Sequence, residues 1–132
     1  MSSRPVALIT GSTRGIGLGI ANALAPTHDL ILNGVREASE VTEPLAALAA
    51  TGAQVHYARG DISTPKGRAA ILDTARNSLG RLDVLVNNAG ATPTKRHDLL
   101  EADAEELDRL LAINCTGPHP LTQAAAGSMT EQ

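Results

Sequence analysis

The sequence is poor in aromatic and sulfur-containing residues. Its 132 residues include one tyrosine and neither phenylalanine nor tryptophan, so a core must be built from Leu, Ile, Val and Ala. The single cysteine, Cys115, excludes an internal disulfide and favours a reducing, cytoplasmic location. The balance of 42% hydrophobic and 19% charged residues is that of a folded globular domain.

Other absences exclude classes of partner. A formal net charge of −3 argues against a nucleic-acid-binding protein, which would normally carry a basic face. No apolar run approaches the length of a membrane span, and the N-terminus lacks the apolar segment of a secretory signal. Four scattered histidines without Cys or carboxylates at ligand spacing predict no metal site. We therefore expect neither nucleic acid nor membrane as a partner.

The most informative feature is the glycine-rich run Thr10–Gly17. It follows the apolar run Val6–Ile9 and opens a stretch in which Ile16, Ile20 and Leu24 recur every four residues. This order predicts a strand, a tight turn and a helix. Glycines let the backbone approach an anion closely, and the N–H groups at the start of the helix hold negative charge. The run therefore predicts a site for a diphosphate.

Strands and helices alternate along the rest of the chain. Further strands are expected at Asp29–Asn33, Gln54–Ala58 and Leu82–Val86. Helices are expected at Gly15–Ala25, Val41–Ala49, Pro65–Leu79 and from about residue 103. Pro120 should disturb the last of these helices early. Such alternation implies a parallel sheet covered on both faces. We predict an α/β fold, a Rossmann-like doubly wound parallel sheet of which residues 1–132 hold the first four strands as one domain.

Polar and glycine-rich residues fall at the expected carboxyl ends of all four strands. They are Thr10–Gly17, Asn33-Gly34, Gly60-Asp61 and Asn87–Gly90. In doubly wound sheets the ligand binds beyond these strand ends. The pattern therefore predicts one shared cleft.

Together these residues resemble the short-chain dehydrogenase/reductase family. That family carries Thr-Gly-xxx-Gly-x-Gly after its first strand, as at Thr10–Gly17, and Asp followed by an apolar residue after its third, as at Asp61-Ile62. It carries Asn-Asn-Ala-Gly after its fourth strand, as at Asn87–Gly90, and then a helical Asn, as at Asn114. Within the family the chain is most similar to 3-oxoacyl carrier-protein reductases and 3-hydroxyacid dehydrogenases.

The resemblance implies a role for the first motif. Gly11, Gly15 and Gly17 would shape the turn around the cofactor diphosphate, and Ile16 would contribute a backbone N–H. The alternative is a glycine turn without a ligand.

The resemblance also implies roles at the third and fourth strand ends. Asp61 would accept a hydrogen bond from the adenine amino group, with Ile62 packed nearby; the alternative is a helix cap. The ribose side of the cleft would be lined by Asn87, Ala89 and Gly90, whose alternative is a simple turn after a strand.

Asn114 is a candidate catalytic residue. It lies three residues after Leu111 and seven after Leu107, so we expect it on a buried apolar helix face. An unpaired buried amide costs roughly 1–3 kcal/mol, so it needs a partner or a function. The resemblance implies that it kinks the helix and holds a water in a proton relay. The alternative is a buried Asn bonded to nearby backbone.

The end of the second strand bears on the choice of cofactor. NAD-binding sites of this type place a carboxylate there, bonded to the ribose 2′-OH. Here the strand end, Leu32–Arg36, contains no acid, and the first carboxylate after it is Glu37. Arg14 in the glycine turn and Arg36 after the strand suit a 2′-phosphate. We expect NADP, with NAD as the alternative; both arginines could instead be solvated surface residues.

The family's hydride transfer uses a Ser, a Tyr and a Lys four residues after the Tyr. The only tyrosine, Tyr57, has Asp61 at that spacing, and the chain ends eighteen residues after Asn114. Three interpretations stay open: the cofactor-binding half of an oxidoreductase acting on a small carbonyl or hydroxy compound, a non-catalytic dinucleotide-binding module, or a structural partner of a full-length relative. An open edge at Leu82–Val86 and leucines exposed on the last helix predict self-association.

Overall fold

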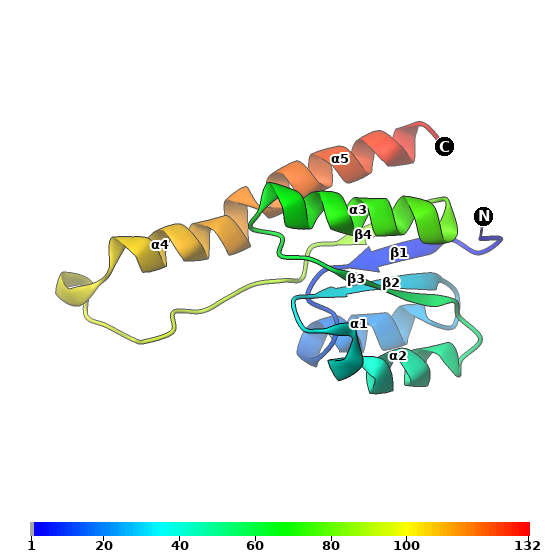
Figure 1. Cartoon of the computed structure of the whole chain (residues 1–132), viewed down its shortest axis with the longest axis horizontal. Coiled ribbons are helices and arrows are strands. Elements are labelled where there is room, and N and C mark those ends of the chain that lie inside the picture. The colour runs from blue at the N-terminus through cyan, green and yellow to red at the C-terminus, as the bar shows by residue number, and fades with distance from the viewer. Residues whose placement is uncertain (1) are drawn as a thin grey trace.

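In the computed structural model, which describes residues 2–132, helices cover both faces of a four-stranded parallel sheet (Figure 1). The strands are β1 (Val6–Ile9), β2 (Asp29–Gly34), β3 (Val55–Arg59) and β4 (Val84–Val86). Their order is β3-β2-β1-β4, and in this register Leu8 lies beside Ile31 and Leu85. The predicted α/β, Rossmann-like arrangement of the first four strands is confirmed.

The helices form two layers. They are α1 (Gly15–Leu24), α2 (Thr42–Ala49), α3 (Pro65–Leu79), α4 (Ala104–Leu111) and α5 (Pro118–Thr130), with short 3-10 turns η1 (Ala38–Glu40) and η2 (Leu99–Glu101) and a π-helical turn η3 (Ala112–Thr116). Helices α1 and α2 cover one face of the sheet and α3 and α5 the other, while α4 projects away from it (Figure 1). No helix within residues 2–132 is long and apolar enough to cross a membrane.

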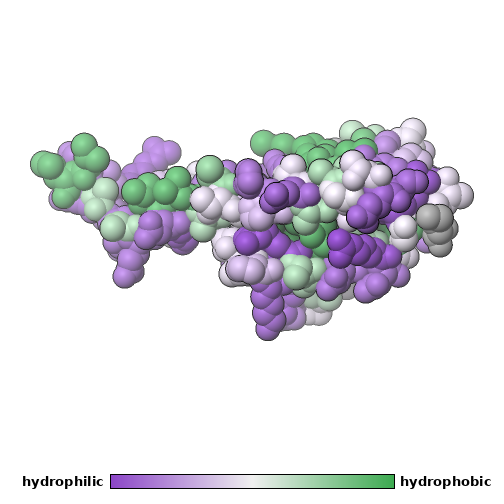
Figure 2. All heavy atoms as spheres, turned by 90° about the horizontal axis from the view of Figure 1, so that it is seen from above, coloured by the Kyte–Doolittle hydropathy of each residue, from purple (hydrophilic) through white to green (hydrophobic). Residues whose placement is uncertain are grey.

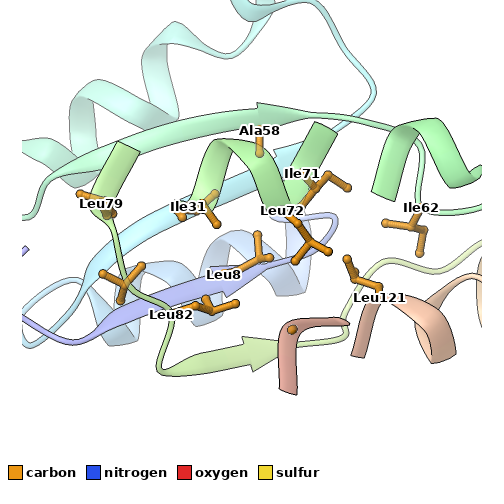
Figure 3. Close-up of a cluster of buried hydrophobic side chains, with 12 residues drawn as sticks. Leu8, Ile31, Ala58, Ile62, Ile71, Leu72, Leu79, Leu82 and Leu121 are labelled. Atoms are coloured by element: carbon orange, nitrogen blue, oxygen red, sulfur yellow. The ribbon is translucent and has the colours of Figure 1, made fainter. Parts of the chain in front are cut away.

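The core is aliphatic and consists of two layers, one on each face of the sheet. Alternate residues of β1 point to opposite faces. Leu8 packs with Ile71 of α3 and Leu121 of α5 (Figure 3), whereas Ile9 packs in the layer that contains Ala21 of α1. The sheet is therefore buried on both faces, as the apolar strand sequences predict.

The fourth strand is shorter than predicted. The expectation of Leu82–Val86 is wrong by two residues, because β4 begins at Val84. The backbone of Leu82 bonds instead to the side chain of Gln132, which accepts its N–H and donates to its carbonyl, both at 2.7 Å.

The last helical segment is interrupted upstream of Pro120. The break is η3, where the Gly117 N–H donates to the carbonyl of Ala112, five residues back, at 2.8 Å. Pro120 lies in the first turn of α5, where backbone N–H groups have no acceptor within the helix, so the missing N–H of proline costs no hydrogen bond. The helix continues to Thr130. The prediction that Pro120 disturbs the helix is therefore wrong.

Candidate dinucleotide site

The carboxyl ends of the strands open into a cleft of about 660 Å³. Most of the predicted site residues line it: Gly11, Arg14, Gly15, Ile16, Gly17, Arg36, Asp61, Ile62, Ala89 and Gly90. A smaller hollow of about 240 Å³, lined by residues of α3, α5 and Gln132, contains none of them. The four sequence motifs thus meet where the fold predicts a ligand.

The glycine turn brings two backbones into contact. Gly11 and Gly15 have φ values of 60° and 59°, which favour glycine. A Cβ on Gly11 would lie 2.8 Å from the Ala89 Cα, and one on Gly17 would strike the Gly11 carbonyl and the Asn88 amide. The absence of side chains at Gly11 and Gly17 therefore lets the glycine turn pack directly against the turn after β4.

Helix α1 presents its N-terminus to the cleft. Arg14, at the N-cap, makes no side-chain capping bond, and the first turn contains no acidic residue. Ile16 is 79% exposed although it is apolar, and it lines the cleft. The first N–H groups of the helix and its positive end can accordingly bind an anion.

Asn33 joins three segments at this edge. Its side chain is buried; Nδ2 donates to the carbonyls of Ala58 and Gly60 at 3.0 Å each, and Oδ1 accepts the Gly11 N–H at 3.2 Å. One amide thus fixes the ends of β2 and β3 against the glycine turn. Sequence reasoning marked Asn33 only as a strand end and missed this role.

Thr10 and Asn88 lock the turn after β4 onto the glycine turn. Thr10 Oγ1 accepts the N–H groups of Asn88 and Ala89 at 3.1 and 3.0 Å. In return, Asn88 Nδ2 donates to the carbonyls of Thr10 and Gly11 at 3.0 and 2.9 Å. Both residues fell within the quoted motifs, but neither was singled out as a site residue.

Arg36 and Asp61 line the cleft where β2 and β3 end. Arg36 Nη2 donates to Thr13 Oγ1 at 2.9 Å. Asp61 is exposed, and its Oδ1 accepts from the N–H and hydroxyl of Ser63 at 2.9 and 2.7 Å. The cap of α3 is Thr64, whose hydroxyl accepts from a backbone N–H in the first turn, so Asp61 is not the helix cap.

Two predicted residues do not line the cleft. Asn87 Nδ2 donates to Thr122 Oγ1 of α5 at 2.8 Å. Asn114 lies in η3, where its Oδ1 accepts the Ala91 N–H at 3.0 Å and its Nδ2 donates to the Ala91 carbonyl at 2.9 Å. Asn114 therefore holds the segment that leaves the fourth motif.

The expected burial of Asn114 is wrong. Its side chain is exposed, because the apolar helix face that it shares does not face the core. Leu107 and Leu111 on that face are 57% and 46% exposed. The amide is nevertheless paired with backbone.

Within residues 2–132 no group of three His, Cys, Asp or Glu side chains is placed to hold a metal ion. The polar groups of the cleft are backbone amides, arginines, Asn and Asp, which suit a phosphate-bearing ligand rather than a bare cation.

Comparison with known proteins gives consistent matches. A family model described as short chain dehydrogenase matches residues 5–132. Ketoacyl reductase 2 of the granaticin polyketide synthase of Streptomyces violaceoruber is 39% identical over 123 residues, which are 92% of this chain and 48% of that protein.

Solved structures agree in fold. The 3-oxoacyl-[acyl-carrier protein] reductase of Brucella melitensis in complex with NAD superimposes with a TM-score of 0.91 and 34% identity, over 98% of this chain and 51% of that one. L-sorbose reductase of Gluconobacter frateurii, complexed with NADPH and L-sorbose, superimposes with a TM-score of 0.87 and 31% identity, over 96% of this chain and 48% of that one. The chain spans about half the length of each of these proteins.

Proposed function

The chain belongs to the short-chain dehydrogenase family, and we propose that it forms the dinucleotide-binding half of an NAD(P)-dependent oxidoreductase acting on a small carbonyl or hydroxy compound, 3-oxoacyl compounds among them. The observation that supports this most directly is the locked pair of turns. The glycine turn after β1 and the turn after β4 are joined by Thr10 and Asn88 around one cleft.

The diphosphate would lie against the glycine turn. Gly11 and Gly17 let the turn pack closely, a Cβ on Gly15 would meet no protein atom within 4 Å, and the N–H groups at Ile16 and its neighbours would supply donors at the positive end of α1. No side chain of the turn other than Arg14 carries charge.

The adenosine would lie between the ends of β2 and β3. There Asp61 would accept from the adenine amino group and Ile62 would pack against the ring. Arg14 and Arg36 both line the cleft, and a guanidinium matches the geometry of a 2′-phosphate. We therefore propose a preference for NADP over NAD.

The nicotinamide ribose would lie toward Ala89 and Gly90, with Asn87 and Asn114 as positioning residues behind that turn. The bound nicotinamide supplies the hydride chemistry. A proton donor or acceptor of the family type, Tyr with Lys four residues later, does not occur in these 132 residues. The hydroxyl of Tyr57 donates to the Arg36 carbonyl at 2.8 Å, so we expect no appreciable turnover by this polypeptide alone.

The test is titration of the purified chain with NADPH and NADH, followed by nicotinamide fluorescence, with a panel of carbonyl compounds present in parallel. We expect saturable binding, tighter for NADPH, without oxidation. Arg36→Gln should weaken NADPH about tenfold, the scale of one charge-assisted contact, and leave NADH unchanged. Arg76→Gln is the matched control, because it removes the same charge from an exposed site on α3.

Each outcome separates the interpretations. Turnover would contradict our account of the missing proton donor. Absence of binding would contradict an intact cleft and leave a structural partner as the better interpretation. Binding without turnover agrees both with the cofactor-binding half of an enzyme and with a non-catalytic module. Adding the C-terminal half of a relative would distinguish them, because only the cofactor-binding half of an enzyme should then gain activity.

A further inference from the structure

Two side chains of β3 hold the loop that follows β2. Tyr57 and Arg59 are two residues apart on this edge strand, so they project from the same face. Tyr57 Oη donates to the Arg36 carbonyl at 2.8 Å, and Arg59 Nε donates to the Val35 carbonyl at 3.1 Å. Two consecutive carbonyls of the loop are thus fixed from β3.

The same contacts separate two opposite charges. Arg59 Nη1 pairs with Glu37 Oε1 at 2.6 Å, so the first carboxylate after β2 is held by β3. The adjacent guanidinium of Arg36 donates to Thr13 and lines the cleft, whereas Glu37 does not line it. The loop accordingly presents its positive side chain, Arg36, to the cleft and its negative one, Glu37, to Arg59.

Tyr57 also limits what the end of β2 can carry. A Cβ on Gly34 would lie 3.2 Å from Tyr57 Oη and 3.3 Å from Thr13 Oγ1, closer than ordinary contact. A carboxylate on residue 34, where an acid could reach a ribose 2′-OH, would have to displace one of these side chains. The phenol and the threonine together keep this position small.

We propose that Tyr57 and Arg59 are positioning residues that make the cleft select a 2′-phosphorylated dinucleotide. This inference rests on the proposed function and assigns its selectivity to residues that need not touch the ligand. Released from Arg59, the Glu37 carboxylate would repel a 2′-phosphate and could accept from a 2′-hydroxyl. Without the Tyr57 hydroxyl, the Arg36 carbonyl would lose its hydrogen bond to β3, and the loop would hold the Arg36 side chain less firmly toward the cleft.

Both residues can be substituted without loss of the core. The side chains of Arg59 and Glu37 are 53% and 61% exposed, and exposed ion pairs contribute little to stability. Tyr57→Phe retains the ring that packs beside α1 and α2 and removes only the hydroxyl. Burial raises the pKa of the Tyr57 phenol, so in the parent chain the hydroxyl stays a donor at neutral pH.

The experiment measures dissociation constants of 2′,5′-ADP, 5′-AMP, NADPH and NADH for the parent chain, Tyr57→Phe, Arg59→Gln and the control Arg76→Gln. The readout is the ratio of affinities with and without the 2′-phosphate, because a structural defect would weaken both ligands equally. We expect this ratio to fall about tenfold in Arg59→Gln and about threefold in Tyr57→Phe, the scale of one hydrogen bond. It should not change in Arg76→Gln.

Arg59→Gln gives the sharpest signature, since NADPH should weaken while NADH stays equal or tightens. The inference would be overturned if NADPH and NADH weakened equally, or if the ratio of affinities stayed unchanged in Tyr57→Phe and Arg59→Gln. The proposed NADP preference of the parent chain would still stand in that case. A parent chain that binds 2′,5′-ADP no tighter than 5′-AMP would overturn that preference, and the inference with it. Unfolding midpoints of all four proteins show whether any change in affinity follows from a change in stability.

Discussion

At the scale of single residues, the glycine at position 17 is required by contact with its neighbours. An added methyl group would lie 2.8 Å from the Ser12 Cα and would also strike the Gly11 carbonyl and the Asn88 amide. Gly17→Ala should therefore displace the two turns, lower the free energy of unfolding by about 1–3 kcal/mol and abolish NADPH binding.

Gly19→Ala is the matched control on the same helix. A Cβ on Gly19 meets nothing within 4 Å, so this change should stabilise α1 by about 0.5–1 kcal/mol and leave binding intact. Urea unfolding followed by circular dichroism, with NADPH titration beside it, measures both effects. Similar results for the two variants would contradict the contact argument.

The residues of the site differ in how far the sequence predicts them. Glycines and an arginine in a strand–helix turn have a local signature, and the structure brings Gly11, Arg14 and Gly17 to the cleft. The roles of Asn33 and Asn88 have no such local signature, because their partner carbonyls lie up to 27 and 78 residues away in sequence, respectively. A buried amide shows its partners only once the strands are paired.

At the scale of elements, α4 is tied to the segment that leads from the cleft. Glu106 Oε1 accepts the Thr94 N–H at 2.6 Å and pairs with Arg109 at 2.8 Å, and Arg109 also donates to the Thr92 carbonyl at 3.0 Å. The Arg109 guanidinium, followed by the Thr94 N–H, lowers the pKa of Glu106 to about 2. An ionised Glu106 thus holds Thr94 of this segment against α4, beside the bond from Arg109 to Thr92.

The sign of the pH dependence follows from this lowered pKa. A carboxyl whose folded pKa lies below its unfolded value stabilises the fold above the unfolded pKa, and the contribution is lost as pH falls toward about 2. We expect the Thr94 amide resonance to keep its position down to about pH 3 and then shift. In Glu106→Gln the resonance should be displaced at neutral pH, whereas Glu105→Gln should leave it in place; a shift near pH 4.5 in the parent chain would contradict the pairing.

The elements also show where periodicity stops being informative. Strands and helices up to α3 agree with the apolar pattern. Leu107 and Leu111 are exposed, as expected for the last helix, whereas the burial expected of Asn114 on the same face is not found. The π turn η3 contains Asn114, the residue at which the family resemblance implied a kink, but apolar spacing alone does not predict it. Gly117, which follows η3, lies against Ile62: a Cβ on Gly117 would lie 3.0 Å from the Ile62 carbonyl carbon. Hydrophobic spacing predicts which face of a helix is apolar, but not whether that face packs on the core of the same chain or is exposed.

At the scale of the whole molecule, residues 92–111 form an arm that extends from the body (Figure 1). Hydrophobic side chains gather at its end (Figure 2), where Leu99 and Leu100 are 86% and 94% exposed. Among the described residues, β4 pairs only with β1 and β3 only with β2, so both edge strands of the sheet are also open. An exposed apolar surface and an unpaired strand edge both favour association with another chain.

We therefore expect the chain to self-associate through the arm. The double variant Leu99→Asp/Leu100→Asp should lower the weight-average mass measured by light scattering toward the 13.6 kDa of one chain, because two charges would have to be desolvated in any apolar contact. Ala47→Asp on the exposed side of α2 is the control for added charge and should leave the mass unchanged. A parent chain that stays at 13.6 kDa at high concentration would contradict self-association. Association that persists in the double variant would contradict the role of Leu99 and Leu100 and point to another surface, such as the β4 edge or the exposed Leu107 and Leu111 of α4.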